Sequence, residues 1–330
     1  MPTVAIYCKA SIHNGMGHIY RQINLANELR KQGWEITFYI PNFSPAIGLL
    51  TQSGFSSIIS DFESSIPKNL ENFFDFFILD MQNTTELLVY TVKKNSRWTV
   101  SFEDLGKGRN YVDILVDCNQ DKSESKNIPS NTKGLFGLDY SILHLDFDHY
   151  HKQSRKFNIS LKSLLITMGA TDPKNLTLPL IHFLIQEKSD IELTVLIGYN
   201  ITSSPELSQF LNKFKSLNIL GPVQNMAQIL WEHDAVICSG GITLHEAIAV
   251  GTPAFVVNQV EHQQTKAKFV ERLGAAINLG VGNQYDVKKL REVLSFRKPA
   301  LESMSLKAKQ LIDGRGIFRV IDAMKKMIKV

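Results

Sequence analysis

The chain alternates short apolar runs with longer amphipathic stretches, and this alternation begins twice. In the first half, apolar runs predict strands at residues 4–7, 35–40, 74–79, 98–102 and 114–116. Apolar positions at helical spacing lie between them and predict helices at 17–32 and 84–94. Short apolar strands that alternate with helices are typical of a parallel, doubly wound sheet.

The second half repeats the scheme, with strands predicted at 164–168, 193–197, 235–238 and 254–257 and helices at 176–186 and 263–273. The polar segment 144–158 is interpreted as a linker or first connecting helix, and 316–330 as one amphipathic helix. We therefore predict an α/β fold of two Rossmann-like domains facing across a cleft. The N-terminal domain takes residues 1–150 and the helix 316–330, and the C-terminal, nucleotide-binding domain takes residues 159–315.

Composition narrows the classes of partner. The 330 residues carry a formal charge of +4 and no run of five or six basic residues, so nucleic acid is not expected. Lys325 and Lys326 are interpreted as a solvated helix face, with peripheral contact to anionic lipid as the alternative. No apolar run reaches the ~18 residues that span a bilayer. Cys8, Cys118 and Cys238 lie in apolar runs and indicate reduced core residues of a cytoplasmic protein.

Two glycine-rich turns each follow a predicted strand and open a predicted helix. The sequence GMGH occupies 15–18 and SGGIT occupies 239–243. A glycine turn at a helix start presents free backbone N–H groups and the positive end of the helix dipole. Ligands of doubly wound sheets bind beyond the carboxyl ends of the strands. We therefore expect the two turns to hold a phosphorylated ligand from both sides of the cleft.

His18 is the candidate for chemistry. An imidazole can take a proton from water near neutral pH, and the positive end of a helix favours the neutral ring. The alternative is a histidine that caps the helix or contacts phosphate without proton transfer. Asp80 and Asp104 end predicted strands, where they either orient His18 or water or simply cap loops. The adjacent acids Glu103 and Asp104 lack a convincing set of further metal ligands, so neither a metal nor a cofactor is expected.

Four segments resemble one known group of proteins. They are GMGHIYRQINLA at 15–26, LLITMGATDPKNLT at 164–177, SGGITLHEAIAVGTP at 239–253 and EHQQTKAKFVERLGA at 261–275. Together they resemble the GT-B-fold hydrolases that remove UDP from a diacetamido-trideoxy sugar in pseudaminic acid biosynthesis. The similarity extends to spore-coat polysaccharide proteins and, more distantly, to the peptidoglycan N-acetylglucosaminyltransferase. FEDLGKG at 102–108 is similar to a subgroup sometimes fused to sugar cytidylyltransferases, which implies such an enzyme as a partner.

The resemblance implies a cytoplasmic, metal-independent UDP-sugar hydrolase of nonulosonic acid or surface-polysaccharide biosynthesis. Water activated by His18 would attack the anomeric carbon of an acetamido-deoxy sugar and UDP would leave. Glu246 would hold both ribose hydroxyls, for which the alternative is a first-turn Glu that favours the helix dipole. Gly240, Gly241 and Ile242 would donate backbone N–H groups to the pyrophosphate. Thr243 would add its hydroxyl or cap the helix.

A further set of residues is expected to contact the sugar or phosphates, namely Asn14, Gly15, Gly17, Tyr140, Gly169, Thr171, His262, Gln263 and Gln264. Each has a simpler interpretation. The glycines suit tight turns, and the amides at 263–264 suit a polar surface. Asp172-Pro173 also suits a helix start with proline at its first position. His262 is expected to be exposed or to stand behind the residues that touch the ligand.

The chain departs from the hydrolase pattern at two places. Where those hydrolases carry an Arg and an Asp before the glycine turn, this chain has Tyr7-Cys8-Lys9-Ala10, and His144 replaces an Arg after the Tyr140 segment. The sugar and the reaction type are therefore left open.

The main alternative is a glycosyltransferase, whose acceptor hydroxyl replaces water. A lipid acceptor would require an exposed apolar and basic patch, for which 43–55 is a candidate although it suits a buried helix better. A non-catalytic nucleotide-sugar binding module is a weaker alternative, which the missing charges before the glycine turn suggest. A dinucleotide oxidoreductase is weaker still, since no GxGxxG follows either first strand.

Overall fold

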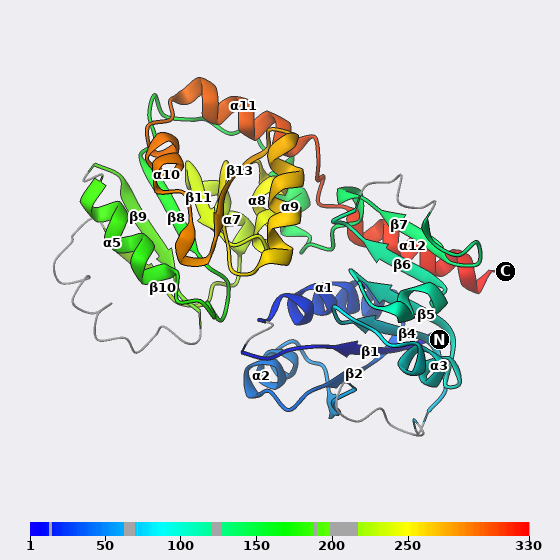
Figure 1. Cartoon of the computed structure of the whole chain (residues 1–330). Helices are drawn as coiled ribbons and strands as arrows, with labels where there is room; N and C mark the ends of the chain where they lie inside the picture. The colour runs from blue at the N-terminus through cyan, green and yellow to red at the C-terminus, as the bar shows by residue number, and fades with distance from the viewer. Residues whose placement is uncertain are drawn as a thin grey trace. The chain divides into compact units, whose positions relative to one another are not determined.

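The computed structural model describes residues 1–12, 15–62, 70, 72–120, 127–187, 190–198 and 217–329. The chain divides into two compact units (Figure 1), which are described separately. The first unit contains Met1–Leu143 together with Arg315–Val330, and the second contains His144–Gly314. The chain thus leaves the first unit once and returns to it at its C-terminus.

The first unit is built on one parallel sheet of seven strands in the order β3-β2-β1-β4-β5-β6-β7. The strands are β1 Thr3–Cys8, β2 Glu35–Ile40, β3 Ser57–Ile59, β4 Phe74–Asp80, β5 Ser96–Phe102, β6 Ile114–Asp117 and β7 Lys133–Phe136. The chain starts at β1, builds outward to β3, and then crosses back to place β4 on the other side of β1. Such a reversal of strand order opens a crevice between β1 and β4, where ligands bind in folds of this type.

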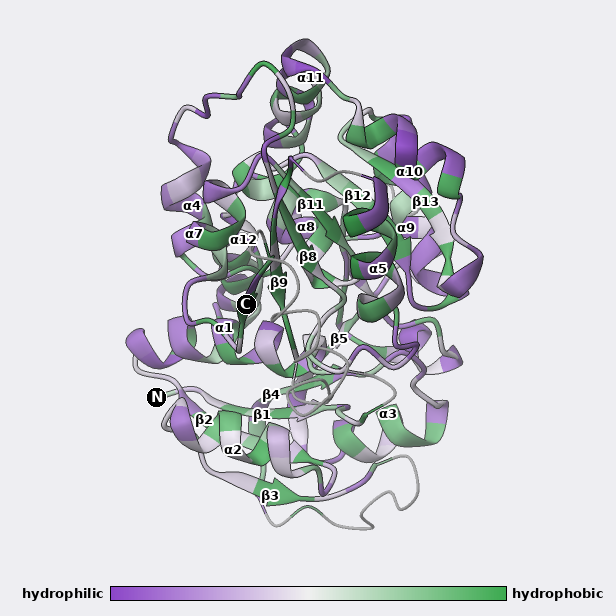
Figure 2. Cartoon of the chain, turned by 90° about the vertical axis from the view of Figure 1, so that its left-hand side faces the viewer, coloured by the Kyte–Doolittle hydropathy of each residue, from purple (hydrophilic) through white to green (hydrophobic). Residues whose placement is uncertain are grey.

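Helices cover both faces of this sheet. They are α1 Gly17–Lys31, α2 Ser44–Gln52, α3 Glu86–Lys93 and α12 Gly316–Ile328, with short 3-10 helices at Lys107–Tyr111 and Leu138–Tyr140. Helices α1 and α12 lie on one face, and α2 and α3 lie on the other (Figures 1 and 2). Gly316 allows α12 to begin directly against the backbone of Ser141, since a Cβ at this position would overlap the Ser141 carbonyl oxygen.

The core of the first unit is rich in aromatic side chains. The rings of Tyr7 and Phe62 stack with centroids 4.4 Å apart, and Phe77 packs beside them. Strand residues are buried on both faces of the sheet, as parallel strands covered by helices require. Cys8 and Cys118 are buried thiols that form no disulfide, and so is Cys238 in the second unit. The expectation of reduced core cysteines is confirmed.

The second unit repeats the topology with six parallel strands in the order β10-β9-β8-β11-β12-β13. The strands are β8 Ser163–Thr167, β9 Glu192–Leu196, β10 Leu217–Leu220, β11 Ala235–Cys238, β12 Ala254–Asn258 and β13 Ala276–Val281. The helices are α4 Asp146–His151, α5 Thr177–Glu187, α7 Met226–Glu232, α8 Ile242–Val250, α9 Glu261–Arg272, α10 Val287–Leu294 and α11 Lys298–Lys309. One apolar cluster joins the sheet to α5, α10 and α11, and the crevice between β8 and β11 corresponds to that between β1 and β4.

The structure differs from the sequence prediction at several elements. The short strands β3, β7, β10 and β13 and the helices α7, α10 and α11 were not predicted. All four of these strands lie at the edges of their sheets and contain partly exposed residues. The strands of the sheets are mostly hydrophobic, whereas the outer helices carry hydrophilic surfaces (Figure 2). The segment expected to link the domains contains α4, which packs against α7 and α8. The second unit therefore begins at His144 rather than at residue 159.

Candidate functional site

The turn after β1 places the first glycine motif at the crevice of the first unit. Gly15 has a φ of +75° and its N–H donates to Ser11 O at 2.9 Å, so the chain reverses tightly before α1. Positive φ is a conformation that glycine adopts without steric cost. Met16 is the N-cap residue and Gly17 is the first residue of α1. Asn14, expected to contact the ligand, lies outside the described residues.

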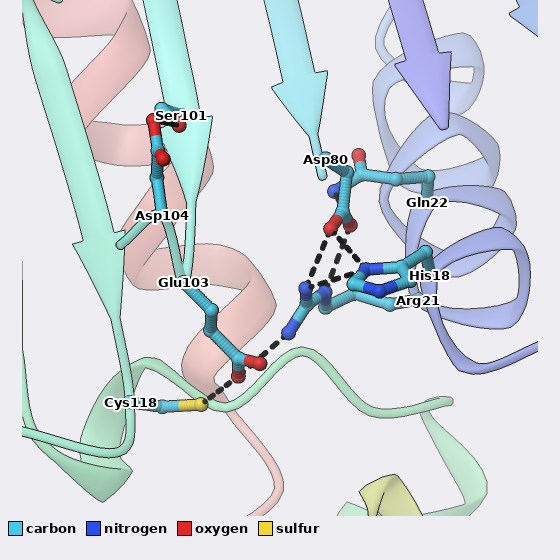
Figure 3. Close-up of polar contacts among 8 residues, drawn as sticks. All are labelled: His18, Arg21, Gln22, Asp80, Ser101, Glu103, Asp104 and Cys118. Carbon is cyan, nitrogen blue, oxygen red and sulfur yellow. Dashed lines mark hydrogen bonds and ion pairs between the residues drawn. The ribbon is translucent and has the colours of Figure 1, made fainter. Parts of the chain in front are cut away.

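His18, the second residue of α1, forms a close pair with Asp80 at the end of β4 (Figure 3). His18 Nδ1 lies 2.6 Å from Asp80 Oδ1. The Asp80 carboxylate is fully buried, whereas the His18 ring is 21% exposed. His18 lies at the start of the helix that follows β1, and Asp80 is the last residue of β4, so the pair lies beside the two strands that flank the crevice. The predicted contact between Asp80 and His18 is therefore present.

Asp80 receives three further hydrogen bonds from α1, which hold it in place. Arg21 donates from Nε to Oδ2 at 2.9 Å and from Nη2 to Oδ1 at 2.6 Å, and Gln22 Nε2 donates to Oδ2 at 2.8 Å. Sequence reasoning missed Arg21 and Gln22. Arg21 stands three residues after His18, so helical spacing places both on one face of α1, and this signal was available.

The hydrogen bonds to Asp80 fix its charge and the tautomer of His18. Burial by itself raises the pKa of Asp80, but the charges and hydrogen bonds of Arg21 and His18 outweigh it and lower the pKa below its usual value. An ionised carboxylate only accepts hydrogen bonds, so His18 must donate its Nδ1–H to Asp80. Nε2 then carries the lone pair. This is the arrangement in which an imidazole acts as a general base and its protonated form is stabilised by the carboxylate.

The two neighbouring acids after β5 serve separate purposes, as Figure 3 shows. Glu103 Oε1 pairs with Arg21 Nη1 at 2.7 Å. The Asp104 carboxylate instead accepts hydrogen bonds from Thr84, from Ser101 Oγ at 2.8 Å and from Gly106 N at 2.8 Å. Asp104 therefore organises the loop, as the simpler interpretation held, and does not orient His18. Within the described ranges, no group of three or more His, Cys, Asp or Glu side chains is placed to hold a metal ion.

Tyr140 lies in the first unit, in the 3-10 helix that follows β7. Its N–H donates to Gly137 O at 3.0 Å, and Gly137 has a φ of +102°. The peptide that follows packs against the start of α12 at Gly316. β7 is the outermost strand of its sheet and lies three strands from β4. Tyr140 follows the carboxyl end of β7, just as Asp80 stands at the carboxyl end of β4, but Tyr140 lies away from the crevice. Its predicted sugar contact stays a prediction.

In the second unit, the turn 239–241 joins β11 to α8 at the corresponding crevice. Gly241 is the N-cap of α8, and Ile242 and Thr243 are the first helical residues. A glycine N-cap offers no side-chain acceptor to the first-turn N–H groups, which leaves them facing outward from the helix end. The alternative in which Thr243 caps the helix is wrong. Gly240 is a packing requirement, since a Cβ there would overlap Asn258 Oδ1 and crowd Gln263.

Glu246 is the fifth residue of α8 and lies half-buried beside the turn. It is not a first-turn residue, so the helix-dipole alternative is wrong. Burial raises the pKa of Glu246 to about 7, against a smaller opposing effect of the hydrogen bond with Thr243. A carboxyl group with a raised pKa at a strand-to-helix crevice is typical of a functional position.

Residues at the start of α9 lie against the same turn. Gln263 packs beside Gly240 and Gly241, and its Oε1 accepts from the backbone N of Gln259 at 2.8 Å. His262 is exposed and Gln264 is half-buried. The prediction missed Asn258, the last residue of β12, whose Oδ1 is buried and has no hydrogen-bond partner in the part of the chain that the structure describes. The sequence signal for Asn258 was the pair of amides Asn258 and Gln259, which directly follows the predicted apolar strand 254–257.

The segment after β8 reaches the turn from the other side of the crevice. Gly169 has a φ of +87°, and Thr171 is buried. Asp172 does not begin a helix with proline at its first position, which corrects that alternative. Asp172 has a φ of +37° and its carboxylate accepts from Leu176 N, Thr177 N and Thr177 Oγ1, so the helix α5 begins only at Thr177. Gln259 Nε2 donates to Asp172 Oδ1 at 2.8 Å and ties this segment to the end of β12.

Comparison with known proteins places this geometry in context. Residues 163–315 match the glycosyltransferase family 28 C-terminal domain, which covers nearly all of the second unit. The chain is 28% identical to the spore coat polysaccharide biosynthesis protein SpsG of Bacillus subtilis, over 96% of each chain. It is 30% identical to an uncharacterized protein of Methanocaldococcus jannaschii over 79% of its own length, but it spans only 56% of that relative.

Solved structures share the architecture of both units. MurG of Acinetobacter baumannii superimposes with a TM-score of 0.66 at 16% identity, covering 98% of this chain and all of MurG. The UDP co-structure of MnaA from Staphylococcus aureus gives a TM-score of 0.67 at 12% identity, covering 100% of this chain and 97% of MnaA. The chain therefore has two parallel-sheet α/β domains of the GT-B glycosyltransferase fold, and the predicted fold class is confirmed. The predicted similarity to spore-coat polysaccharide proteins is confirmed as well.

Among the described helices, none is both long enough and apolar enough to cross a membrane.

Proposed function

We propose that the protein is a glycosyltransferase that takes a sugar from a UDP-sugar donor and transfers it to a hydroxyl acceptor in polysaccharide biosynthesis. The observation that carries the proposal is the His18–Asp80 pair, which holds Nε2 of a partly exposed imidazole ready to accept a proton. The match of residues 163–315 to a glycosyltransferase domain and the similarity to SpsG support transfer and the biosynthetic role. The MnaA co-structure supports UDP as the nucleotide.

In the proposed reaction, His18 Nε2 removes the proton from the acceptor hydroxyl as its oxygen forms a bond to the anomeric carbon. The bond from that carbon to the β-phosphate oxygen breaks, and its electron pair leaves with UDP. The resulting imidazolium is stabilised by ionised Asp80. A single displacement of this kind inverts the configuration at the anomeric carbon.

The second unit would bind the nucleotide. The N–H groups at Gly240, Gly241 and Ile242 open α8 and suit the charge that develops on the departing diphosphate. Glu246, as a carboxylate, would accept hydrogen bonds from both ribose hydroxyls. Gln263 and Gln264 at the start of α9, with Gly169 and Thr171 across the crevice, are proposed to contact sugar or phosphate. His262 is proposed to support them from its exposed position.

Hydrolysis is the other outcome of the same chemistry, with water in place of the acceptor. It was our first expectation from the sequence, but the similar proteins reported above support transfer and do not name a hydrolase, pseudaminic acid or a cytidylyltransferase. A cytidylyltransferase partner and a cytoplasmic location stay predictions.

The test measures UDP release from a panel of UDP-N-acetylamino sugars, with and without saccharide and lipid-linked acceptors. Wild-type protein is compared with His18→Ala and with His149→Ala, a matched control at an exposed histidine of α4. Release that requires an acceptor and is lost only in His18→Ala supports the transferase. Acceptor-independent release lost in His18→Ala would make the protein a hydrolase. Binding of UDP without turnover on any donor would contradict both.

A further inference from the structure

We propose that Arg21 and Glu103 are positioning residues that set how readily His18 accepts a proton. Arg21 balances the charge of one carboxylate, and Glu103 supplies a second, so the cluster with Asp80 keeps one negative charge. This inference rests on the proposed role of His18 as the base. It concerns contacts within the first unit alone (Figure 3). Glu103 acts through Arg21, and Arg21 acts through Asp80 and through its own approach to His18, whose Nδ1 lies 3.4 Å from Arg21 Nη2.

Arg21 is clamped between two carboxylates. Its Nε and Nη2 donate to Asp80, and its remaining arm, Nη1, reaches Glu103 Oε1 at 2.7 Å. Its side chain is only 9% exposed, and its guanidinium carbon lies 5.4 Å from the centre of the Phe102 ring. A planar guanidinium with a fixed fork of donors is suited to hold two carboxylates at a defined separation. Arg21 therefore fixes the orientation of Asp80 and ties it to Glu103.

The charges of this cluster explain why a second carboxylate is needed. Asp80 alone, paired with Arg21, would form a neutral unit and would have little net charge with which to stabilise an imidazolium. With Glu103 present, one cation faces two anions, and the cluster keeps a single negative charge that protonated His18 balances. The cluster is largely buried, so solvent and salt screen these interactions weakly. Burial lowers the pKa of Arg21, but Asp80 and Glu103 outweigh it and raise the pKa above its ordinary value, which keeps the cation charged.

Besides burial, the interactions that shift the pKa of Asp80 come from Arg21 and His18, and those that shift the pKa of Arg21 come from Asp80, Glu103 and Cys118. Cys8 on β1 is a buried thiol whose pKa is raised by burial and by the charge of Asp80, so it stays neutral. Cys118, just after β6, donates its thiol hydrogen to Glu103 Oε1 at 2.8 Å. Lys9, at the end of β1, donates its backbone N–H to Asp80 O, and its side chain is half-buried.

Two further acids stand at the neighbouring strand ends and are engaged elsewhere. Asp117 Oδ1 accepts from Asn119 N at 3.0 Å, and Asp104 serves the loop contacts described above. Besides Asp80, Glu103 is the acid at these strand ends that pairs with Arg21.

The backbone at Glu103 is shaped to present this carboxylate. Glu103 has a φ of +48°, which is strained for a residue with a side chain. Its N–H donates to Val116 O at 2.8 Å on the neighbouring strand. Strain of this kind persists only where the surrounding structure holds it, and it is concentrated at functional positions. The conformation turns Glu103 toward Arg21 and Cys118, and Asp104, the next residue, toward Ser101.

The test is an NMR titration of His18 in the full chain, with ¹³Cε1-labelled histidine and the signal assigned by its loss in His18→Gln. In Glu103→Gln we expect the titration midpoint to move to lower pH by about one unit, since a unit charge in a partly screened site has an effect of this order. In Arg21→Met the midpoint moves to higher pH. In the double variant Arg21→Met/Glu103→Gln it returns toward the wild-type value, because one negative charge again remains.

Glu35→Gln is the matched control, since it removes a carboxylate from the exposed start of β2 at the opposite end of the strands. A shift in Glu103→Gln no larger than that in Glu35→Gln, or shifts of the same sign in Glu103→Gln and Arg21→Met, would overturn the proposal. If Arg21→Met does not fold, the comparison of Glu103→Gln with Glu35→Gln decides alone. The titration needs no substrate, so its failure is separate from a failure to find UDP-sugar turnover. Where turnover is found, the acid limb of the kcat profile moves with the titration and the donor KM does not.

Discussion

The crevice between β1 and β4 and the crevice between β8 and β11 occupy the same place in the same strand order, yet they differ in chemistry. The first holds a buried network of charged side chains around His18, Asp80 and Arg21. The second holds a glycine N-cap and neutral amides, with Glu246 beside the turn and the Asp172 carboxylate engaged by backbone and side-chain donors of its own segment. In the first unit, the proposed reactivity would come from side chains that one helix and two strand ends bring together. In the second, the proposed binding of the nucleotide would depend mainly on backbone groups at the start of α8.

This difference explains why each crevice tolerates different changes. A charged network is sensitive to the removal of one partner, because the other charges stay buried without compensation. A backbone site is sensitive to added volume, because the chain must approach its ligand closely. The two half-sites should therefore respond to different variants, and variants of one should leave the property of the other intact.

The largest effect is expected for His18→Ala. Loss of a general base lowers turnover by about 10²–10⁴-fold. UDP affinity should be unchanged, because we propose that the nucleotide binds to the second unit. Initial rates of UDP release and calorimetric UDP binding on the same preparations measure both properties. A parallel loss of UDP affinity would show that the two crevices are not functionally distinct.

The next effect concerns Glu246→Gln, which should weaken UDP binding by about 10-fold or more, because hydrogen bonds to a charged acceptor contribute about 1.5–3 kcal/mol. UMP should lose affinity by the same factor, since the ribose is common to both. An equal affinity of wild type and variant would remove Glu246 from the nucleotide site.

The raised pKa of Glu246 also predicts a pH dependence. The carboxylate must be ionised to accept from both hydroxyls, so UDP binding should tighten as pH rises through about 7 and should release a proton below that pH. In the absence of ligand, the folding stability of the unit changes with pH in the opposite direction. Because the pKa rises from 4.5 in the reference state to about 7 in the fold, the stability linked to this group is complete below about 4.5 and is lost as pH rises through about 7. Calorimetry in buffers of different ionisation enthalpy checks the proton release, and Glu246→Gln should show none.

The features of the two crevices that depend on local sequence pattern could be predicted from the sequence. Apolar periodicity and the two glycine turns placed the two sheets, and the position of His18 after the first strand followed from them. The rest of the charged network around the His18–Asp80 contact was not predicted, because Arg21 lies 59 residues from Asp80 and 82 residues from Glu103 in the sequence, and only strand order makes them neighbours. The short strands β3 and β10 were missed because three or four partly exposed residues give too weak an apolar signal.

Gly240 and Gly241 form a matched pair that tests the backbone site. A Cβ at Gly240 would overlap Asn258 Oδ1 and lie 3.0 Å from Gln263 Cβ, whereas at Gly241 the nearest atom outside the adjoining residues is Ser239 Oγ at 3.6 Å. Gly240→Ala should destabilise the second unit by about 1–3 kcal/mol, as overpacking does, and should weaken UDP binding. Gly241→Ala should leave thermal unfolding nearly unchanged. Equal unfolding temperatures for the two variants would contradict the close packing of this turn.

The smallest effect is expected at the turn of the first unit. Gly15 has a φ of +75°, so Gly15→Ala should cost about 1–2 kcal/mol of stability through backbone strain alone. Its N–H bond to Ser11 keeps the turn closed, and the His18–Asp80 contact lies beyond it on α1. The His18 titration should therefore be unchanged while thermal unfolding shifts to lower temperature. If the titration moves as well, the turn and the charged network are coupled, and the first crevice then depends on its backbone as closely as the second does.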